Sequence, residues 1–174
     1  GWESGLVPEK DHVAVKVPVF SFSKLTQVDT NLGPEMKSTG EVLGLAETYE
    51  KALYKGLIGA GLEIPREGTI LATIADKDKK EAVDYIKDFA ELGFKIAATE
   101  GTAAALKEKG LEVDIVKKLG EGSPDSLELI SDDKVDLVIN TLTKGKVPER
   151  DGFKIRRSAV EMGIPCLTSL DTTH

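Results

Sequence analysis

The feature that most constrains the fold is a regular alternation of short apolar runs with longer amphipathic segments after Gly68. Thr69–Ala75 (TILATIA) is typical of a buried strand, and Lys79–Leu92 has the apolar spacing of an amphipathic helix. The same pattern predicts further strands at Phe94–Ala98, Val113–Val116, Val135–Asn140 and Ile164–Thr168, and helices at Thr102–Lys109, Pro124–Ile130 and Arg156–Met162. Strands that alternate with helices predict an α/β fold with a parallel sheet and flanking helices.

The segment that precedes this alternation has a different character. Val13–Phe22 (VAVKVPVFSF) alternates and is rich in valine and phenylalanine, so it predicts a strand, and Pro18 favours an edge position. From Glu41 to Ile58 the apolar residues fall near helical spacing, and a helix is expected there. A segment this short can hardly bury enough surface to stand alone, so we expect its packing partners upstream. We therefore predict two parts, residues 1–62 and 63–174.

Composition excludes several classes of function. The formal net charge of −7 argues against broad electrostatic binding to nucleic acid, which needs a basic face. The apolar runs are too short to span a bilayer, so no membrane association is expected. A single cysteine, Cys166, cannot form an internal disulfide, which fits a reducing compartment. We expect a cytoplasmic protein.

Polar and cationic residues gather where the expected strands end. In an open parallel sheet, ligands bind outside the carboxyl ends of the strands. The candidates at these ends are Thr73, Lys79, Thr99, Gly101, Thr102, Lys118, Asn140 and Thr141. Helix N–H groups, hydroxyls and lysines favour an anion, and a glycine lets the backbone approach it closely. Together these residues predict a pocket for a phosphate monoester, with polar groups left over for a sugar or base.

Each of these signals also has an ordinary structural explanation. The lysines near Lys79 and at Lys118 could be solvated surface charge. Thr99 or Thr102 could be a helix N-cap, and Asn140 could begin a turn. The argument for a site therefore depends on their joint position at successive strand ends.

The usual catalytic groups are scarce. His12 and His174 lie away from the strand-end residues in the sequence, and Cys166 falls inside an apolar strand, where a core role is favoured over a nucleophilic one. Asp125 could be a base, but a carboxylate at a helix start is the better interpretation. The pair Arg156–Arg157 could reach an anion or a neighbouring subunit, or could simply be solvated. No Walker loop is present, and no catalytic residue or metal site is expected in this chain.

Longer motifs resemble a known family. Leu32–Val42 (LGPEMKSTGEV) resembles the end of the second ATP-grasp domain of carbamoyl-phosphate synthetase large subunits. The rest of the chain resembles the carboxy-terminal allosteric domain of that subunit, which has the Rossmann-like methylglyoxal-synthase-like fold. The matching pieces are DKDKKE, AATEGTA, VDIVKKLGEGSPD, VDLVINT and IRRSAVEMGIPCLTSLDT. By this resemblance, residues 1–62 are a carboxy-terminal ATP-grasp fragment and residues 63–174 the allosteric domain.

The resemblance implies an effector site. The family's carboxy-terminal domain binds a nucleotide monophosphate, commonly uridine monophosphate, and the residues that hold it match Thr73, Lys79, Thr99, Thr102, Lys118, Asn140 and Thr141. By this resemblance, relatives that respond to N-acetylglutamate have an aromatic residue at the position of Lys118. A residue is inserted around Leu142–Lys144, so either Leu142 or Thr143 could supply the next contact. The Asp-Thr pair that helps bind ornithine in some members aligns with Leu167–Thr168, so ornithine activation is not expected to carry over.

The resemblance also implies what the intact enzyme does. It makes carbamoyl phosphate for pyrimidine and arginine biosynthesis from bicarbonate, glutamine-derived ammonia and ATP, with Mg²⁺ or Mn²⁺ and with K⁺ as a further possible cofactor. Its partner is a small glutaminase subunit, and an oligomer is expected. Because the magnesium ligands and most ATP contacts lie upstream, this fragment alone should be inactive and should need no cofactor.

Two alternatives remain at this stage. One is a methylglyoxal synthase, although its strand-end histidine–aspartate signature is replaced here by Ala75-Asp76-Lys77-Asp78-Lys79. The other is a purely structural oligomerisation domain.

Overall fold

The computed structural model describes residues 10–20, 36–141 and 151–173, and the chain forms two compact units. Residues 10–20 and 36–63 belong to the first unit, and residues 64–141 and 151–173 to the second. No helix among the described residues is long and apolar enough to cross a membrane.

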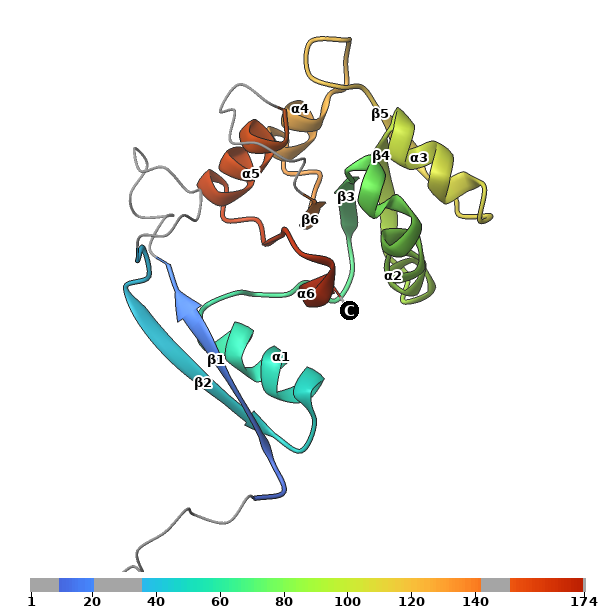
Figure 1. Cartoon of the computed structure of the whole chain (residues 1–174). Coiled ribbons are helices and arrows are strands. Elements are labelled where there is room, and N and C mark those ends of the chain that lie inside the picture. Colours follow the sequence, from blue (N-terminus) through green and yellow to red (C-terminus); the bar gives the residue numbers. More distant parts are fainter. Residues whose placement is uncertain (1–9, 21–35, 142–150, 174) are drawn as a thin grey trace, which may run out of the picture. The chain divides into compact units, whose positions relative to one another are not determined.

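The first unit is an antiparallel strand pair covered by one helix (Figure 1). Strand β1 (Val13–Val19) pairs with β2 (Gly40–Ala46), and helix α1 (Tyr49–Gly59) packs on both. The helix approaches β2 closely at Gly44, where an added β-carbon would collide with the backbone carbonyl of Ala52 and lie 2.7 Å from the Gly56 nitrogen. Glycine at position 44 therefore permits this packing.

The predicted helix over Glu41–Ile58 is wrong in its first part. Residues 40–46 form β2, and α1 begins only at Tyr49, after Thr48, whose hydroxyl accepts from the Lys51 nitrogen at 3.4 Å. In β2 the alternate residues Leu43 and Leu45 are exposed, at 59% and 45%. The apolar residues here that matched helical spacing were Val42 and Leu45, and in the strand they lie on opposite faces. Pairing with β1 overrides the local pattern.

The second unit holds a five-stranded sheet in which each pairing is parallel. Its strands are β3 (Thr69–Thr73), β4 (Lys95–Thr99), β5 (Asp114–Val116), β6 (Leu137–Asn140) and β7 (Cys166–Leu167). Its helices are the short η2 (Asp76–Asp78), α2 (Lys79–Glu91), α3 (Glu100–Lys107), α4 (Ser126–Ser131), α5 (Asp151–Glu161) and α6 (Leu170–Thr173). The predicted α/β architecture with a parallel sheet and flanking helices is confirmed. The sequence did not predict α6, and α5 begins at Asp151 rather than at Arg156.

Hydrophobic clusters on both faces hold this sheet in place. One cluster joins β3, β4 and β6 to α2, α3 and α6 through residues such as Ile70, Ile86 and Leu106. The other joins the opposite face to α4 and α5 through residues such as Leu71 and Ile155. Figure 1 shows α2 and α3 on one side of the strands and α4 and α5 on the other. Neighbouring strand residues such as Ile70 and Leu71 enter different clusters, as expected for a strand buried on both faces.

The strand order creates a switch point between β3 and β6. The order across the sheet is β5-β4-β3-β6-β7. After β3 the chain continues into α2 on one face, whereas the helix that follows β6 is α5, on the other face. Such a reversal leaves a crevice outside the carboxyl ends of the two strands, where open α/β sheets bind ligands. Thr73 and Asn140 end these strands and lie opposite each other in the register.

Candidate functional site at the carboxyl edge of the parallel sheet

The fold brings the predicted site residues to one edge of the sheet. Thr73, Thr99 and Asn140 are the last residues of β3, β4 and β6, and Thr141 follows β6 directly. The remaining members stand at the helix starts or just past β5, at Lys79, Gly101, Thr102 and Lys118. Parallel strands end at the same edge, so the predicted cluster is a spatial one. Whether it binds a ligand stays a prediction.

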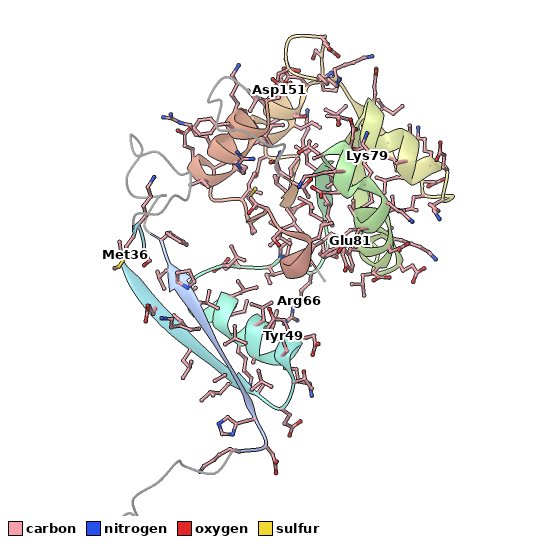
Figure 2. All side chains as sticks on the ribbon, viewed as in Figure 1. Met36, Tyr49, Arg66, Lys79, Glu81 and Asp151 are labelled. Carbon is pink, nitrogen blue, oxygen red and sulfur yellow. The ribbon has the colours of Figure 1, made fainter. Side chains whose placement is uncertain are left out.

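The Lys79 side chain lies between the loop after β3 and the start of α3. It is the first residue of α2, as Figure 2 shows, and its Nζ lies 2.6 Å from Asp76 Oδ1. A β-carbon at Gly101 would lie 3.0 Å from the same Nζ. The Lys79 side chain is 22% exposed, whereas that of Asp76 is 94% exposed. Lys79 holds the pKa of Asp76 below its ordinary value of 3.8, chiefly through this hydrogen bond.

The neighbouring lysines after β5 have different surroundings. Lys117 Nζ pairs with Glu100 Oε1 at 2.7 Å, which raises the pKa of Lys117 and lowers that of Glu100. The charge of Lys118 also lowers the pKa values of Glu100 and Asp76, although more weakly than their own lysine partners do. Among residues 10–20, 36–141 and 151–173, no carboxylate lies within ion-pair distance of Lys118. Lys118 is therefore the lysine whose charge is available to an anion at this edge.

The threonine hydroxyls of Thr102 and Thr141 hold the loop that follows β3. Thr102 Oγ1 accepts from the Ile74 nitrogen at 3.1 Å, and Thr141 Oγ1 accepts from the Ala75 nitrogen at 2.8 Å. Both threonines are buried. Their oxygens thus satisfy consecutive backbone N–H groups, while each hydroxyl hydrogen can still be donated. Both threonines first of all shape the loop, a role that sequence analysis did not identify.

The expected N-cap position in α3 is confirmed for Thr99 and is wrong for Thr102. Thr99 occupies the N-cap position of α3, yet its side chain makes no capping hydrogen bond. Thr102 lies inside the first turn and is bonded to the Ile74 nitrogen instead. The hydroxyl of Thr99 is half-buried at the end of β4. Its position leaves it able to contact a ligand over the start of α3.

A chain of hydrogen bonds crosses the switch point. Asn140 Nδ2 donates to Thr73 Oγ1 at 2.6 Å, and Arg156 Nη1 donates to Asn140 Oδ1 at 2.7 Å. Asn140 is buried, and both atoms of its amide take part in this chain. The residues that would form a turn after it, 142–150, lie outside the described part of the chain. Burial lowers the pKa of Arg156 below its ordinary value. The sequence does not decide whether Arg156 contacts an anion, a neighbouring subunit or solvent, because a pair of arginines looks the same in each case.

Asp125 and Cys166, which were weighed as reactive groups from the sequence, have structural roles. Asp125 caps α4: its Oδ1 accepts from the Leu127 and Glu128 nitrogens at 2.9 and 3.0 Å, which confirms the helix-start interpretation. Cys166 packs against a core cluster, and burial raises the pKa of its thiol to about 12. His12 lies in the first unit, and His174 lies outside the described residues.

Across residues 10–20, 36–141 and 151–173, no group of three or more His, Cys, Asp or Glu side chains is placed to hold a metal ion. The chemistry that this edge offers is that of hydrogen-bond donors and cations. Lys79, Lys118, Arg156 and the first turn of α3 supply it. Such an arrangement suits an anion with acceptor oxygens.

Comparison with known proteins agrees with the fold. A family model described as MGS-like domain matches residues 81–168, just over half of the chain. Among solved structures, the chain is similar to the methylglyoxal synthase from Elizabethkingia anophelis NUHP1, with a TM-score of 0.51 and 22% sequence identity. That similarity covers 63% of this chain and 76% of the other. At this identity, the likeness to the synthase concerns the fold.

Proposed function

This chain belongs to the MGS-like domain family, and from that premise we propose that it is the carboxy-terminal regulatory part of a carbamoyl-phosphate synthetase large subunit. In this proposal the second unit binds a nucleotide monophosphate, with uridine monophosphate as the first candidate. The first unit is the end of an ATP-grasp domain, and the fragment alone has no catalytic activity. The intact cytoplasmic enzyme would use ATP with Mg²⁺ or Mn²⁺ and would work with a glutaminase subunit.

The main observation in support of the effector site is that the Lys79 ammonium group lies close to Gly101. The ammonium group lies 3.0 Å from where a β-carbon of residue 101 would be, at the start of α3 and at the carboxyl edge of the sheet. A phosphate placed there would meet the free N–H groups of the first helical turn and the Lys79 charge. Lys118 would supply a further positive charge, and Thr99 a hydroxyl donor. The absence of a side chain at Gly101 keeps this approach open.

The remaining residues suit the uncharged part of a nucleotide. Thr73 and Asn140 lie at the switch point between β3 and β6, away from the helix start at Gly101 along the sheet edge. The Thr73 hydroxyl can recognise a sugar or a base, whereas the buried Asn140 amide is engaged by Thr73 and Arg156 and acts through Thr73. Thr102 and Thr141 contribute chiefly by holding the loop after β3 in place, since their oxygens already accept from Ile74 and Ala75.

The assignment to carbamoyl-phosphate synthetase is supported by the LGPEMKSTGEV motif. Its residues Leu32–Glu35 lie outside the described part of the chain, and Met36–Val42 lead into and begin β2. A free-standing methylglyoxal synthase has no need of a preceding unit of this kind. The motif and the effector residues therefore support the same enzyme from different parts of the chain.

Methylglyoxal synthase is the second candidate, because a synthase of that name shares the fold. The loop after β3 here reads Ala75-Asp76-Lys77-Asp78-Lys79, without the histidine of the synthase signature. Asp125, which the sequence offered as a possible base, instead caps α4 through its Oδ1. Formation of methylglyoxal from dihydroxyacetone phosphate by the purified chain would favour this candidate over the regulatory one.

Calorimetric titration with uridine monophosphate tests the proposed function. Lys79→Met should weaken binding by roughly tenfold to a hundredfold, since a charged hydrogen bond contributes about 1.5–3 kcal/mol. Lys117→Met is the matched control: it removes a lysine of the same edge that pairs with Glu100 and should change the affinity little. Equal losses in both variants would point to general electrostatic attraction. A folded wild-type chain that binds no nucleotide would favour a purely structural domain instead.

A further inference from the structure

Arg156 is a half-buried cation whose hydrogen-bond partner is an amide. It extends from α5, and its Nη1 donates to Asn140 Oδ1 at 2.7 Å. No carboxylate among the described residues lies within ion-pair distance of it. Withdrawing a charged group from water is costly unless an opposite charge or hydrogen bonds compensate. The contact with Asn140 is therefore the feature to explain.

Arginine determines which way the Asn140 amide faces. A guanidinium has donors and no acceptor, so the amide atom next to it has to be the oxygen. The amide nitrogen then faces Thr73, and it donates to Thr73 Oγ1 at 2.6 Å. Gly152 lies alongside: an added β-carbon there would be 3.4 Å from both amide atoms and 3.6 Å from Arg156 Nη1. Without Arg156, the amide could turn over and present its oxygen to Thr73.

The orientation of this amide decides what Thr73 offers at the switch point. With Asn140 Nδ2 as its donor, the Thr73 oxygen acts as an acceptor, and the hydroxyl hydrogen has to be directed elsewhere. With the amide turned over, the hydroxyl would donate to Asn140 and would offer only lone pairs. These arrangements favour ligands of opposite hydrogen-bonding character at the carboxyl end of β3.

We propose that Arg156 is a positioning residue that fixes the Asn140 amide, so that Thr73 presents a hydrogen-bond donor to an acceptor oxygen of the ligand. The part of this inference that concerns the ligand rests on the proposed effector site. Arg156 itself acts through Asn140. The strand-end site thereby selects an acceptor oxygen of the sugar or base over an amine at the position next to Thr73.

The orientation is tested without any ligand, by NMR of the Asn140 side-chain amide in the full chain. Wild type and Arg156→Lys, which keeps a donor, should show protected amide hydrogens. Arg156→Met should exchange them on the order of tenfold faster, which corresponds to the loss of one modest hydrogen bond. Arg157→Met, at the neighbouring arginine that pairs with Glu161, is the control and should leave the signal unchanged. An unchanged Asn140 signal in Arg156→Met would overturn the proposal. If that variant does not fold, Arg156→Gln replaces it, because glutamine can accept as well as donate.

Titration with uridine monophosphate then tests the consequence for binding. Thr73→Val and Arg156→Met should each weaken binding by about tenfold, and the double variant should lose little more, since both remove the same donor. Fully additive losses, or wild-type affinity in Arg156→Met with a loosened amide, would refute the link to the ligand. If wild type binds no nucleotide, the proposed function fails, whereas the amide measurement still decides whether Arg156 orients Asn140.

Discussion

Replacing Gly101 with alanine should separate ligand binding from stability. The atom that a β-carbon at Gly101 would meet is Lys79 Nζ, at 3.0 Å, and this is the far end of a flexible side chain. A shift of a few tenths of an ångström relieves the contact, so folding should not suffer. Alanine in a helix is favoured over glycine by up to about 1 kcal/mol, so the melting temperature should stay the same or rise.

Binding should respond in the opposite direction. The new methyl group fills the approach to the α3 start and moves the Lys79 ammonium from its position. Losing one charged hydrogen bond to a phosphate costs about 1.5–3 kcal/mol, which predicts an affinity for uridine monophosphate lower by roughly tenfold to a hundredfold. Calorimetry gives the affinity and thermal denaturation the stability. Gly40→Ala is the control, because a β-carbon there meets Val19 Cβ at an ordinary 3.9 Å. Unchanged affinity, or a large fall in melting temperature, would refute this reasoning.

Further predictions concern the loop, the first unit and the thiol. Thr102→Val should destabilise the second unit by about 1–3 kcal/mol, because the buried Ile74 N–H loses its acceptor, whereas Thr102→Ser should restore most of the loss in urea unfolding. Gly44→Ala should destabilise the first unit by about 1–3 kcal/mol or more, because the added methyl group overpacks against α1. Amide hydrogen exchange in β1 and β2 should become faster in this variant and should stay unchanged in the control Gly40→Ala. The Cys166 thiol, with a pKa raised by burial to about 12, should resist alkylation at pH 8 in the folded chain and react after unfolding.

The second unit was predictable because its central strands, β3 and β6, are buried on both faces. Runs such as Thr69–Ala75 and Val135–Asn140 are too apolar to be surface segments, and helices of distinct periodicity separate them. The strand order was not predictable, since nothing in a buried run states its neighbours. The start of the helix in the first unit was mispredicted because Val42 and Leu45 continue the apolar spacing of α1 towards the N-terminus. Both residues instead belong to β2, which pairs with β1.

The sequence was sufficient to predict which residues lie at the strand ends, but not what each side chain does there. Residue types and parallel topology together place Thr73, Lys79 and Asn140 at one edge. Which hydroxyl accepts from a loop N–H and which faces outward depends on loop geometry that the sequence does not contain. Arg156 was undecided for the same reason: only the fold shows that α5 brings its guanidinium to the end of β6.

The surroundings of Lys79 bear on how strongly the proposed site can bind. Asp76 already pairs with the ammonium group at 2.6 Å, and Lys79 lowers the pKa of that carboxyl, so a phosphate has to compete with an ionised carboxylate. The gain from Lys79 is then the difference between two charged contacts rather than the whole of one. Lys118 has no such competitor among the described residues, so its charge should contribute more fully to binding, although its exposure subjects it to screening by salt.

Affinity should therefore fall with ionic strength more steeply in Lys79→Met, where Lys118 supplies the attraction, than in a Lys118→Met chain that keeps the better-buried Lys79. Titrations of both variants with uridine monophosphate at low and high salt measure this difference. Equal salt dependence would contradict the expectation that the ion pair with Asp76 makes the two lysines contribute differently to binding.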